Sequence, residues 1–381
     1  MKQKKLSIPL IFILLSTNLA GCWNYREIDK MVIVGGIAID LNEFDGKYEV
    51  TAELSTIKSG KDSIIVPKYL SASGNSIFEI IRELITKAGQ KLYFSHSKVI
   101  ILSDSLARKG ISEVIDWYCR DAETRTDVNI LISKEKTAKE ILISNSITGS
   151  LISFQLDEIL RNEKNISTFP VVDLWDVTDN LIQNGLDVSI PTISIDKSNS
   201  IPTIVVDGTA IFKKDKLIGT INKNFSKFIF FAKDEIKGGL LVLDEDNSLP
   251  ITFEIFTNKT KVNPITKNGN LKFNITTDTT VSLAEIQSQE NFYTEEERTN
   301  LENRVSFMIE NNIYASIKML QEEYDTDIIG LGKILYQHDP KLWYKLQEDW
   351  EQVFKTLDIS VNSKVKIKNS ATTNKPVQIG D

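Results

Sequence analysis

The chain has 381 residues and a formal net charge of −7 at pH 7. This acidic balance argues against nucleic acid or an anionic lipid surface as the main partner. The length exceeds what one ordinary core can organise and predicts two or three domains.

Residues 1–21 have the pattern of a lipoprotein signal peptide. Three lysines precede an apolar run from Leu6 to Leu15, which is too short to span a hydrocarbon core of about 30 Å as a permanent helix. Small residues then lead into a cysteine in Leu19-Ala20-Gly21-Cys22. We predict cleavage before Cys22 and acyl chains on that residue, which would hold the protein at the extracytoplasmic face of a membrane. The alternative is an ordinary secretion signal with a coincidental cysteine.

Cleavage would leave 360 residues with a formal charge of −10, because the signal carries three lysines and no acid. No later apolar run approaches 18 residues, so the lipid would be the only membrane attachment. Cys119 then has no disulfide partner. We expect it to be a small buried side chain in a helical stretch rather than a reactive thiol.

The first predicted domain, residues 22–200, mixes strands and helices; a split near residue 135 is an alternative. Apolar runs and alternation predict strands at 31–39, 47–57, 92–102 and 128–132. Helical spacing predicts helices at 77–88, between Ser76 and Gly89, and at 111–119, 138–143, 154–161 and 172–183. The Ser-, Gly- and Lys-rich residues 58–75 are predicted to be a loop.

Asp196 to Pro202 is the best candidate for a linker, and the second predicted domain is residues 201–368. We expect a hairpin over 203–221, antiparallel strands at 240–243, 251–261 and 271–277, and a long helix after Thr294. A shorter helix would carry Trp343 and Trp350 on one face. A last strand at 357–367 would return to the second sheet, followed by a polar tail at 369–381. The predicted class is α+β, multi-domain, with mixed and antiparallel sheets flanked by helices.

Tests for catalysis are negative. The two histidines, His96 and His338, lack metal-site spacing, and no phosphate-binding loop or nucleophile elbow occurs. Ser-x-x-Lys occurs at 55–58, 95–98 and 194–197, but without the downstream elements that such enzymes need. We therefore predict a protein that is not an enzyme and that needs no cofactor or metal.

Several segments carry, in order, motifs that are known from one protein family. The first is Cys22-Trp23-Asn24-Tyr25-Arg26-Glu27-Ile28, which has Asn24 in place of the usual Asp. The others are Ile37 to Asp40, Phe94 to Ile100, Arg120 to Arg125, Asp207 to Phe212, Leu217 to Gly219, and Asp327 to Gly332 followed by Trp343 and Trp350. Together these segments resemble the Ger(x)C spore germination lipoproteins, and the first is similar to the start of the mature family members.

The resemblance implies a non-enzymatic C subunit of a GerA-type germinant receptor at the outer face of the spore inner membrane, working with membrane-spanning A-type and B-type subunits. The motif residues Trp23, Arg26, Glu27, His96, Asp207, Gly208, Gly330, Gly332, Trp343 and Trp350 are candidates for structural or partner contacts. The simplest interpretation of these motifs is structural. It predicts tight backbone geometry at Gly35-Gly36 and Gly330-x-Gly332, a turn at Asp207-Gly208 and a hydrogen-bonded core contact at His96. The alternative function is a solute-binding lipoprotein of a transporter.

Overall fold

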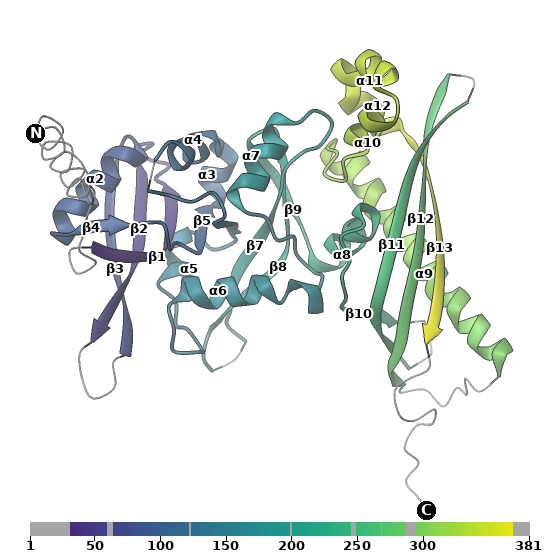
Figure 1. The fold of residues 1–381 in the computed structure, drawn as a ribbon, viewed down its shortest axis with the longest axis horizontal. Helices are drawn as coiled ribbons and strands as arrows, with labels where there is room; N and C mark the ends of the chain where they lie inside the picture. Colours follow the sequence, from purple (N-terminus) through teal and green to yellow (C-terminus); the bar gives the residue numbers. More distant parts are fainter. Residues whose placement is uncertain are drawn as a thin grey trace, which may run out of the picture.

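The computed structural model describes residues 31–58, 64–121, 123–198, 200–244, 249–267, 269–286 and 294–368. The predicted signal peptide, the motif residues Cys22, Trp23, Arg26 and Glu27, and the tail at 369–381 lie outside the described residues. Two β-sheets lie side by side along the long axis of the molecule, each covered by helices (Figure 1). The predicted class, α+β with mixed and antiparallel sheets flanked by helices, is confirmed.

The first sheet is mixed. Its strand order is β3-β2-β1-β5-β6-β7-β8-β9, with β4 also paired to β1. The strands are β1 (Met31–Leu41), β2 (Tyr48–Lys58), β3 (Ile64–Gly74), β4 (Lys91–Tyr93), β5 (Val99–Ser103), β6 (Asn129–Ser133), β7 (Ser189–Asp196), β8 (Thr203–Lys213) and β9 (Lys216–Ile221). The central strands β1, β5, β6 and β7 run parallel, and the strands on either side of them pair antiparallel.

Helices cover both faces of this sheet (Figure 1). On one face lie α2 (Ile77–Ala88), α3 (Asp104–Lys109), α4 (Ser112–Arg120) and α7 (Leu174–Ile182); on the other lie α5 (Ala138–Leu142) and α6 (Ile152–Arg161). Ile37 and Ile39 of β1 belong to the first of the two cores, whereas Ala38 belongs to the second. Strand β1 is therefore buried on both faces, as its continuous apolar run predicted.

Three sequence predictions for this region are wrong. Residues 58–75 are mostly strand β3 rather than loop, because β3 is an edge strand paired to β2 and can expose polar side chains. The strand predicted at 92–102 is two strands, β4 and β5, which pair with successive parts of β1. Cys119 is exposed, because α4 turns Val114, Ile115 and Tyr118 toward the core and Cys119 away from it.

The predicted linker Asp196 to Pro202 connects β7 to β8, which are antiparallel neighbours in the first sheet. The sheet thus continues across residue 200 into the predicted hairpin β8–β9, which turns at Lys213 to Asp215. The division of the chain into domains 22–200 and 201–368 stays a prediction.

The second sheet has the order β10-β11-β12-β13. Its strands are β10 (Leu240–Leu243), β11 (Ile251–Lys267), β12 (Asn270–Ile286) and β13 (Asp358–Lys368). The antiparallel pairing predicted for β10, β11 and β12 is confirmed, and so is the return of the last strand to this sheet, where β13 runs parallel to β12. Helix α8 (Lys223–Lys233) lies between the two sheets and contacts both β8 and β11 (Figure 1).

The predicted long helix is α9 (Glu295–Met319), which packs along β13 and begins at a capping box formed by Thr294 and Glu297. Three of its side chains cover the free edge of β13. Glu302, Ser306 and Glu310 accept hydrogen bonds from the backbone N–H groups of Ile367, Val365 and Ser363 at 2.8, 3.0 and 2.7 Å. These residues are spaced by one helical turn, so they meet alternate N–H groups of the strand. A strand edge that would otherwise be open to pairing is thereby closed.

After a π-helical turn at Leu320–Tyr324, three short helices complete the fold: α10 (Leu331–His338), α11 (Pro340–Leu346) and α12 (Trp350–Thr356). The single helix predicted to carry Trp343 and Trp350 is wrong, because a 3₁₀ turn at Gln347–Asp349 separates α11 from α12. In the described part of the chain, no helix is both long enough and apolar enough to cross a membrane.

Candidate functional site

The motif residues near the C-terminal end form one buried cluster around the Asp327 carboxylate. Its Oδ1 accepts from the backbone N–H groups of Gly330 and Leu331 at 2.8 and 3.1 Å. Its Oδ2 accepts from the N–H of Gly332 at 2.9 Å and from the indole Nε1 of Trp350 at 3.1 Å. Asp327 therefore satisfies the otherwise unpaired N–H groups at the start of α10 and fixes Trp350 from α12.

Burial raises the pKa of Asp327 from 3.8 to about 6, while its four hydrogen bonds act in the opposite direction. The hydrogen-bond donors hold this carboxylate on every side, which is the arrangement of a structural acceptor. A catalytic acid or base would need an open side for a substrate.

Close packing explains the glycines of this cluster. A Cβ atom on Gly332 would lie 2.7 Å from Cα of Gly185 and 2.8 Å from ring atoms of both Trp343 and Trp350. Gly330, the residue before α10, has a φ of +86°, which glycine adopts without strain. The rings of Trp343 and Trp350 are 5.2 Å apart between centroids and both are buried. Although they lie on separate helices, the two tryptophans meet in the core.

The cluster also joins the two sheets. Asp187, just before β7, accepts from the Thr326 hydroxyl at 2.8 Å and from the Asp327 N–H at 3.0 Å through its Oδ2. The N–H of Lys333 donates to the carbonyl of Gly185 at 2.8 Å. The segment before β7, in the first sheet, is thus bonded to the segment that opens α10, which belongs to the second core. We call this set of contacts the junction.

Two further buried carboxylates accept from helix N-termini in the same way. Asp40, at the end of β1, accepts from the N–H groups of Ala138 and Lys139 at 2.6 and 3.1 Å. Glu53 of β2 accepts from Ile152 and Ser153 at 2.9 and 3.0 Å. Burial raises the pKa of both groups, that of Asp40 to about 6. These carboxylates place α5 and α6 on the sheet.

Gly35-Gly36 of β1 allows α6 to approach the sheet. A Cβ on Gly35 would lie 2.5 Å from the Ser153 hydroxyl, and one on Gly36 would lie 2.8 Å from the Ser153 Cβ. Both glycines therefore sit where any side chain would push away the helix that Glu53 holds.

Asp207 and Gly208 lie inside β8 rather than in a turn, which corrects the sequence prediction. The pairing register between β7 and β8 shifts at this point, and Gly208 has a φ of +78°, as in a glycine-containing β-bulge. A Cβ on Gly208 would lie 2.4 Å from the carbonyl oxygen of Ile221. The Asp207 carboxylate pairs with Lys134 at 3.0 Å on the surface. The predicted core contact of His96 is also wrong, because His96 is exposed beside Tyr93, in the connection between β4 and β5.

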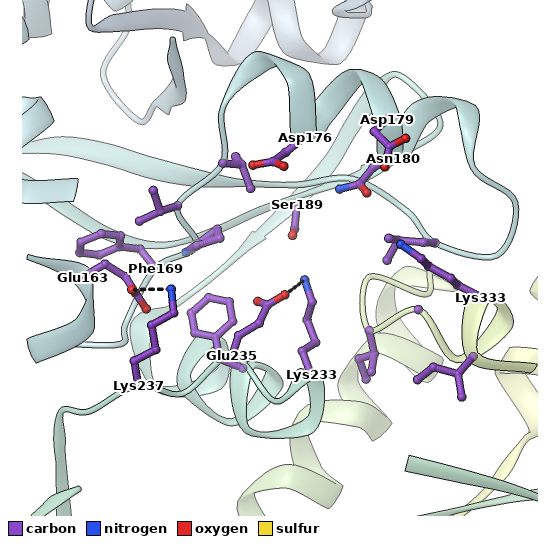
Figure 2. Close-up of a pocket in the computed structure, with 18 of the residues that line it drawn as sticks. Glu163, Phe169, Asp176, Asp179, Asn180, Ser189, Lys233, Glu235, Lys237 and Lys333 are labelled. Atoms are coloured by element: carbon purple, nitrogen blue, oxygen red, sulfur yellow. Dashed lines mark ion pairs between the residues drawn. The ribbon is translucent and has the colours of Figure 1, made fainter. Parts of the chain in front are cut away.

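Next to the junction lies a cavity of about 540 Å³ between α7, α8 and α10. Figure 2 shows its polar and charged lining: Asp176, Asp179 and Asn180 come from α7, and Lys333 comes from α10. Lys233 pairs with Glu235 at 3.0 Å and Lys237 with Glu163 at 3.9 Å within the lining. In the described ranges, no group of His, Cys, Asp and Glu residues has the arrangement of a metal site.

The cluster brings together Gly330, Gly332, Trp343 and Trp350, whereas His96, Asp207 and Gly208 lie elsewhere. Sequence reasoning did not assign roles to Asp187, Gly185 or Glu53. Glu53 and Asp40 do carry a signal, because each is an acidic residue within or at the end of an otherwise buried strand. Asp187 and Gly185 carry none, since their partners are distant in the sequence.

A solved structure shares the fold of this chain. The crystal structure of the GerBC protein matches with a TM-score of 0.57 at 23% identity, over 87% of this chain and 96% of that chain, which defines the class of fold. Residues 24–195 match the family described as "Spore germination protein N-terminal domain", and residues 207–371 match "Spore germination B3/ GerAC like, C-terminal".

Relatives match along almost the whole chain. "Spore germination protein B3" of Bacillus subtilis (strain 168) is 26% identical over 96% of this chain and 98% of its own length. "Spore germination protein GerQC" of Bacillus cereus is 26% identical over 96% of this chain and 99% of its own length. The chain belongs to the Ger(x)C family of spore germination proteins.

Proposed function

We propose that this chain is a lipid-anchored, non-enzymatic C subunit of a nutrient germinant receptor. It is held by acyl chains on Cys22 at the outer face of the spore inner membrane. There it acts in germination through contacts with membrane-spanning A-type and B-type subunits.

The observation that carries the proposal is the match to spore germination proteins in both parts of the chain. The two family matches cover residues 24–195 and 207–371, and each of the relatives named above matches over 96% of this chain. A function in germination therefore rests on the whole chain rather than on one shared domain. The anchor rests on the sequence Leu19-Ala20-Gly21-Cys22.

The buried cluster supports action by contact rather than catalysis. The motif carboxylate of Asp327 is occupied by four donors, and Gly332 and Trp350 are packed against each other. These residues maintain the shape of the folded part of the chain. Because the proposed anchor tethers this folded part to the membrane, it meets partners in the same membrane at a high effective concentration, so weak contacts suffice.

The anchor and the partners are tested together in sporulating cells. A tagged chain should incorporate labelled fatty acid and co-purify from spore membranes with an A-type or B-type subunit. The Cys22→Ala variant should lose the label and the co-purification. The anchor would be contradicted if the wild-type protein carried no labelled fatty acid, or if the variant stayed in the membrane fraction as fully as the wild type does.

The alternative of a solute-binding lipoprotein makes a different prediction. It requires saturable binding of a small molecule by the isolated protein and a partnership with an ATP-driven permease. Titration of the purified chain with nutrients, read by calorimetry, separates the two functions. Tight stoichiometric binding together with unimpaired germination of a deletion strain would favour the transporter function.

A further inference from the structure

The outer face of the second sheet is open and rich in lysine. Along β13, Ile359 and Val365 are buried in the core, so the alternate residues Lys364, Lys366 and Lys368 point outward, and all three are exposed. On β11, Lys259 and Lys261 flank the buried Thr260 and are likewise exposed. The pairing register sets Lys259, Asp278 and Lys364 side by side across three strands. We call this surface the lysine face.

The charge of this face is opposite to that of the whole chain. Its lysines are Lys259, Lys261, Lys267, Lys272, Lys364, Lys366 and Lys368, and its carboxylates are Glu254, Asp278, Glu285 and Asp358. Lysines therefore outnumber carboxylates here, although the chain as a whole carries −7. The net charge averages over the molecule and conceals this local excess.

The lysines are also available to a partner. Lys272 pairs with Asp358 at 3.1 Å. Within the described ranges, by contrast, Lys259, Lys261, Lys364, Lys366 and Lys368 form no ion pair. Besides Asp278, their neighbours on the face include short polar side chains, such as Thr276, Thr280 and Asn362.

Apolar side chains lie at one end of the same face. Phe256 is 51% exposed, and the ammonium group of Lys368 lies 5.9 Å from the centroid of its ring. Leu240 and Val242 of β10 are 47% and 50% exposed, and Leu240 is in register with Glu254 on the neighbouring strand. Exposed apolar side chains beside a row of lysines are the combination found in segments that rest in a membrane interface.

We propose that the lysine face docks on a bilayer that contains anionic lipid. Charge complementarity identifies this partner, because lysines near such a surface are attracted within a Debye length. Phe256, Leu240 and Val242 would enter the headgroup region. The inference rests on the proposed lipid anchor, which would bring the lysine face to a membrane in the cell. The attraction between the lysines and anionic lipid does not depend on that anchor.

The position of the face explains why a second contact is useful. β1, where the described chain begins, and the second sheet lie at opposite ends of the long axis (Figure 1). An anchor at the N-terminal end alone would leave the other end free to swing. A weak electrostatic contact at the second sheet would lay the body along the membrane, because tethering makes that contact intramolecular.

The test uses the full mature chain, residues 22–381, with Cys22→Ala, so that no acyl group is present. Its binding is measured by co-sedimentation with vesicles of pure phosphatidylcholine and with vesicles containing phosphatidylglycerol. We expect binding to the anionic vesicles only, and its loss in high salt. The substitutions Lys364→Gln, Lys366→Gln and Lys368→Gln together should weaken binding about a hundredfold, since each lysine contributes about fivefold.

Two matched variants make the result specific. Lys68→Gln, Lys136→Gln and Lys341→Gln remove the same charge from exposed positions outside the face and should leave binding unchanged. Lys-to-Arg substitutions at 364, 366 and 368 should bind as the parent does, which also shows that the strand tolerates substitution. Equal weakening by both glutamine sets, equal binding to both kinds of vesicle, or binding to neither would overturn the proposal. Because this chain is unacylated, none of these outcomes depends on whether Cys22 is a true anchor.

Discussion

Asp187 and Asp327 hold each other by two reciprocal hydrogen bonds, although 140 residues separate them in the sequence. The N–H of Asp187 donates to the carbonyl of Asp327 at 3.0 Å, and the N–H of Asp327 donates to the Asp187 carboxylate at 3.0 Å. This pair joins the first sheet to the helices of the second core.

Replacing Asp327 by Asn should destabilise the whole chain. The amide would keep one acceptor oxygen and would turn an NH₂ group toward donors that Asp327 now satisfies. Since each unsatisfied buried group costs about 1–3 kcal/mol, we expect a loss of about 3 kcal/mol in the free energy of unfolding. Urea titration of the purified protein measures it. Asp349→Asn, an exposed position beside Trp350, is the control, and equal stability of the two variants would contradict the role given to Asp327.

Gly332→Ala should destabilise the junction by overpacking. The added Cβ would lie within 2.8 Å of Gly185, Trp343 and Trp350, and none of these can move without disturbing the core. Small-to-large changes in packed cores cost about 1–3 kcal/mol. Thermal unfolding of this variant should therefore begin at a lower temperature than that of Lys333→Ala, one residue along the same helix. Identical unfolding curves would show that the packing is looser than the distances indicate.

Asp40 should make stability depend on pH. Burial raises its pKa from 3.8 to about 6, so the folded chain binds this proton more tightly than the unfolded chain. The stabilisation is then complete below pH 4 and is lost as the pH rises through 6. A shift of this size corresponds to about 3 kcal/mol. The stability difference between wild type and Asp40→Asn, measured by urea unfolding, should fall by that amount from pH 4 to pH 7. If the stabilities of the two proteins changed in parallel with pH, the raised pKa of Asp40 would be contradicted.

The edge of β13 should open when its helix contacts are removed. Glu302→Ala and Glu310→Ala leave the N–H groups of Ile367 and Ser363 without acceptors. We expect hydrogen exchange at these two amides to accelerate about tenfold or more, since a lost hydrogen bond is worth about 1.4 kcal/mol of local opening. Asn311→Ala, an exposed neighbour on α9, should leave both rates unchanged. Unaltered exchange in the glutamate variants would mean that packing alone protects the edge.

Much of the fold could be predicted because local sequence patterns specify many of its helices and strands. The buried run of β1, the cap at Ser76 and the alternation of β13 each specify one element. β3 could not be recognised, because its polar and small residues are tolerated only at the edge beside β2. The bulge at Gly208 resembles a turn locally, and only the register against β7 distinguishes the two.

The cluster at the junction could be predicted only in part. Gly330, Gly332, Trp343 and Trp350 stood out by their residue types and spacing. The hydrogen bonds of Asp327 to Gly330 and Gly332 are local, whereas its link to Asp187 depends on pairing across 140 positions, which no local pattern encodes. The lysine face could not be predicted for a related reason, because β13, which carries Lys364, Lys366 and Lys368, is far in the sequence from β11 and β12.

The most direct test of the account is germination of spores that lack this gene. Dipicolinate release is measured with a set of nutrients and with a trigger that bypasses receptors, in strains complemented with wild type or with Cys22→Ala. We predict that the deletion abolishes the response to one nutrient set, that wild type restores it, that Cys22→Ala does not, and that the receptor-independent trigger works in every strain. Unchanged nutrient germination in a deletion strain without a redundant receptor would contradict the account.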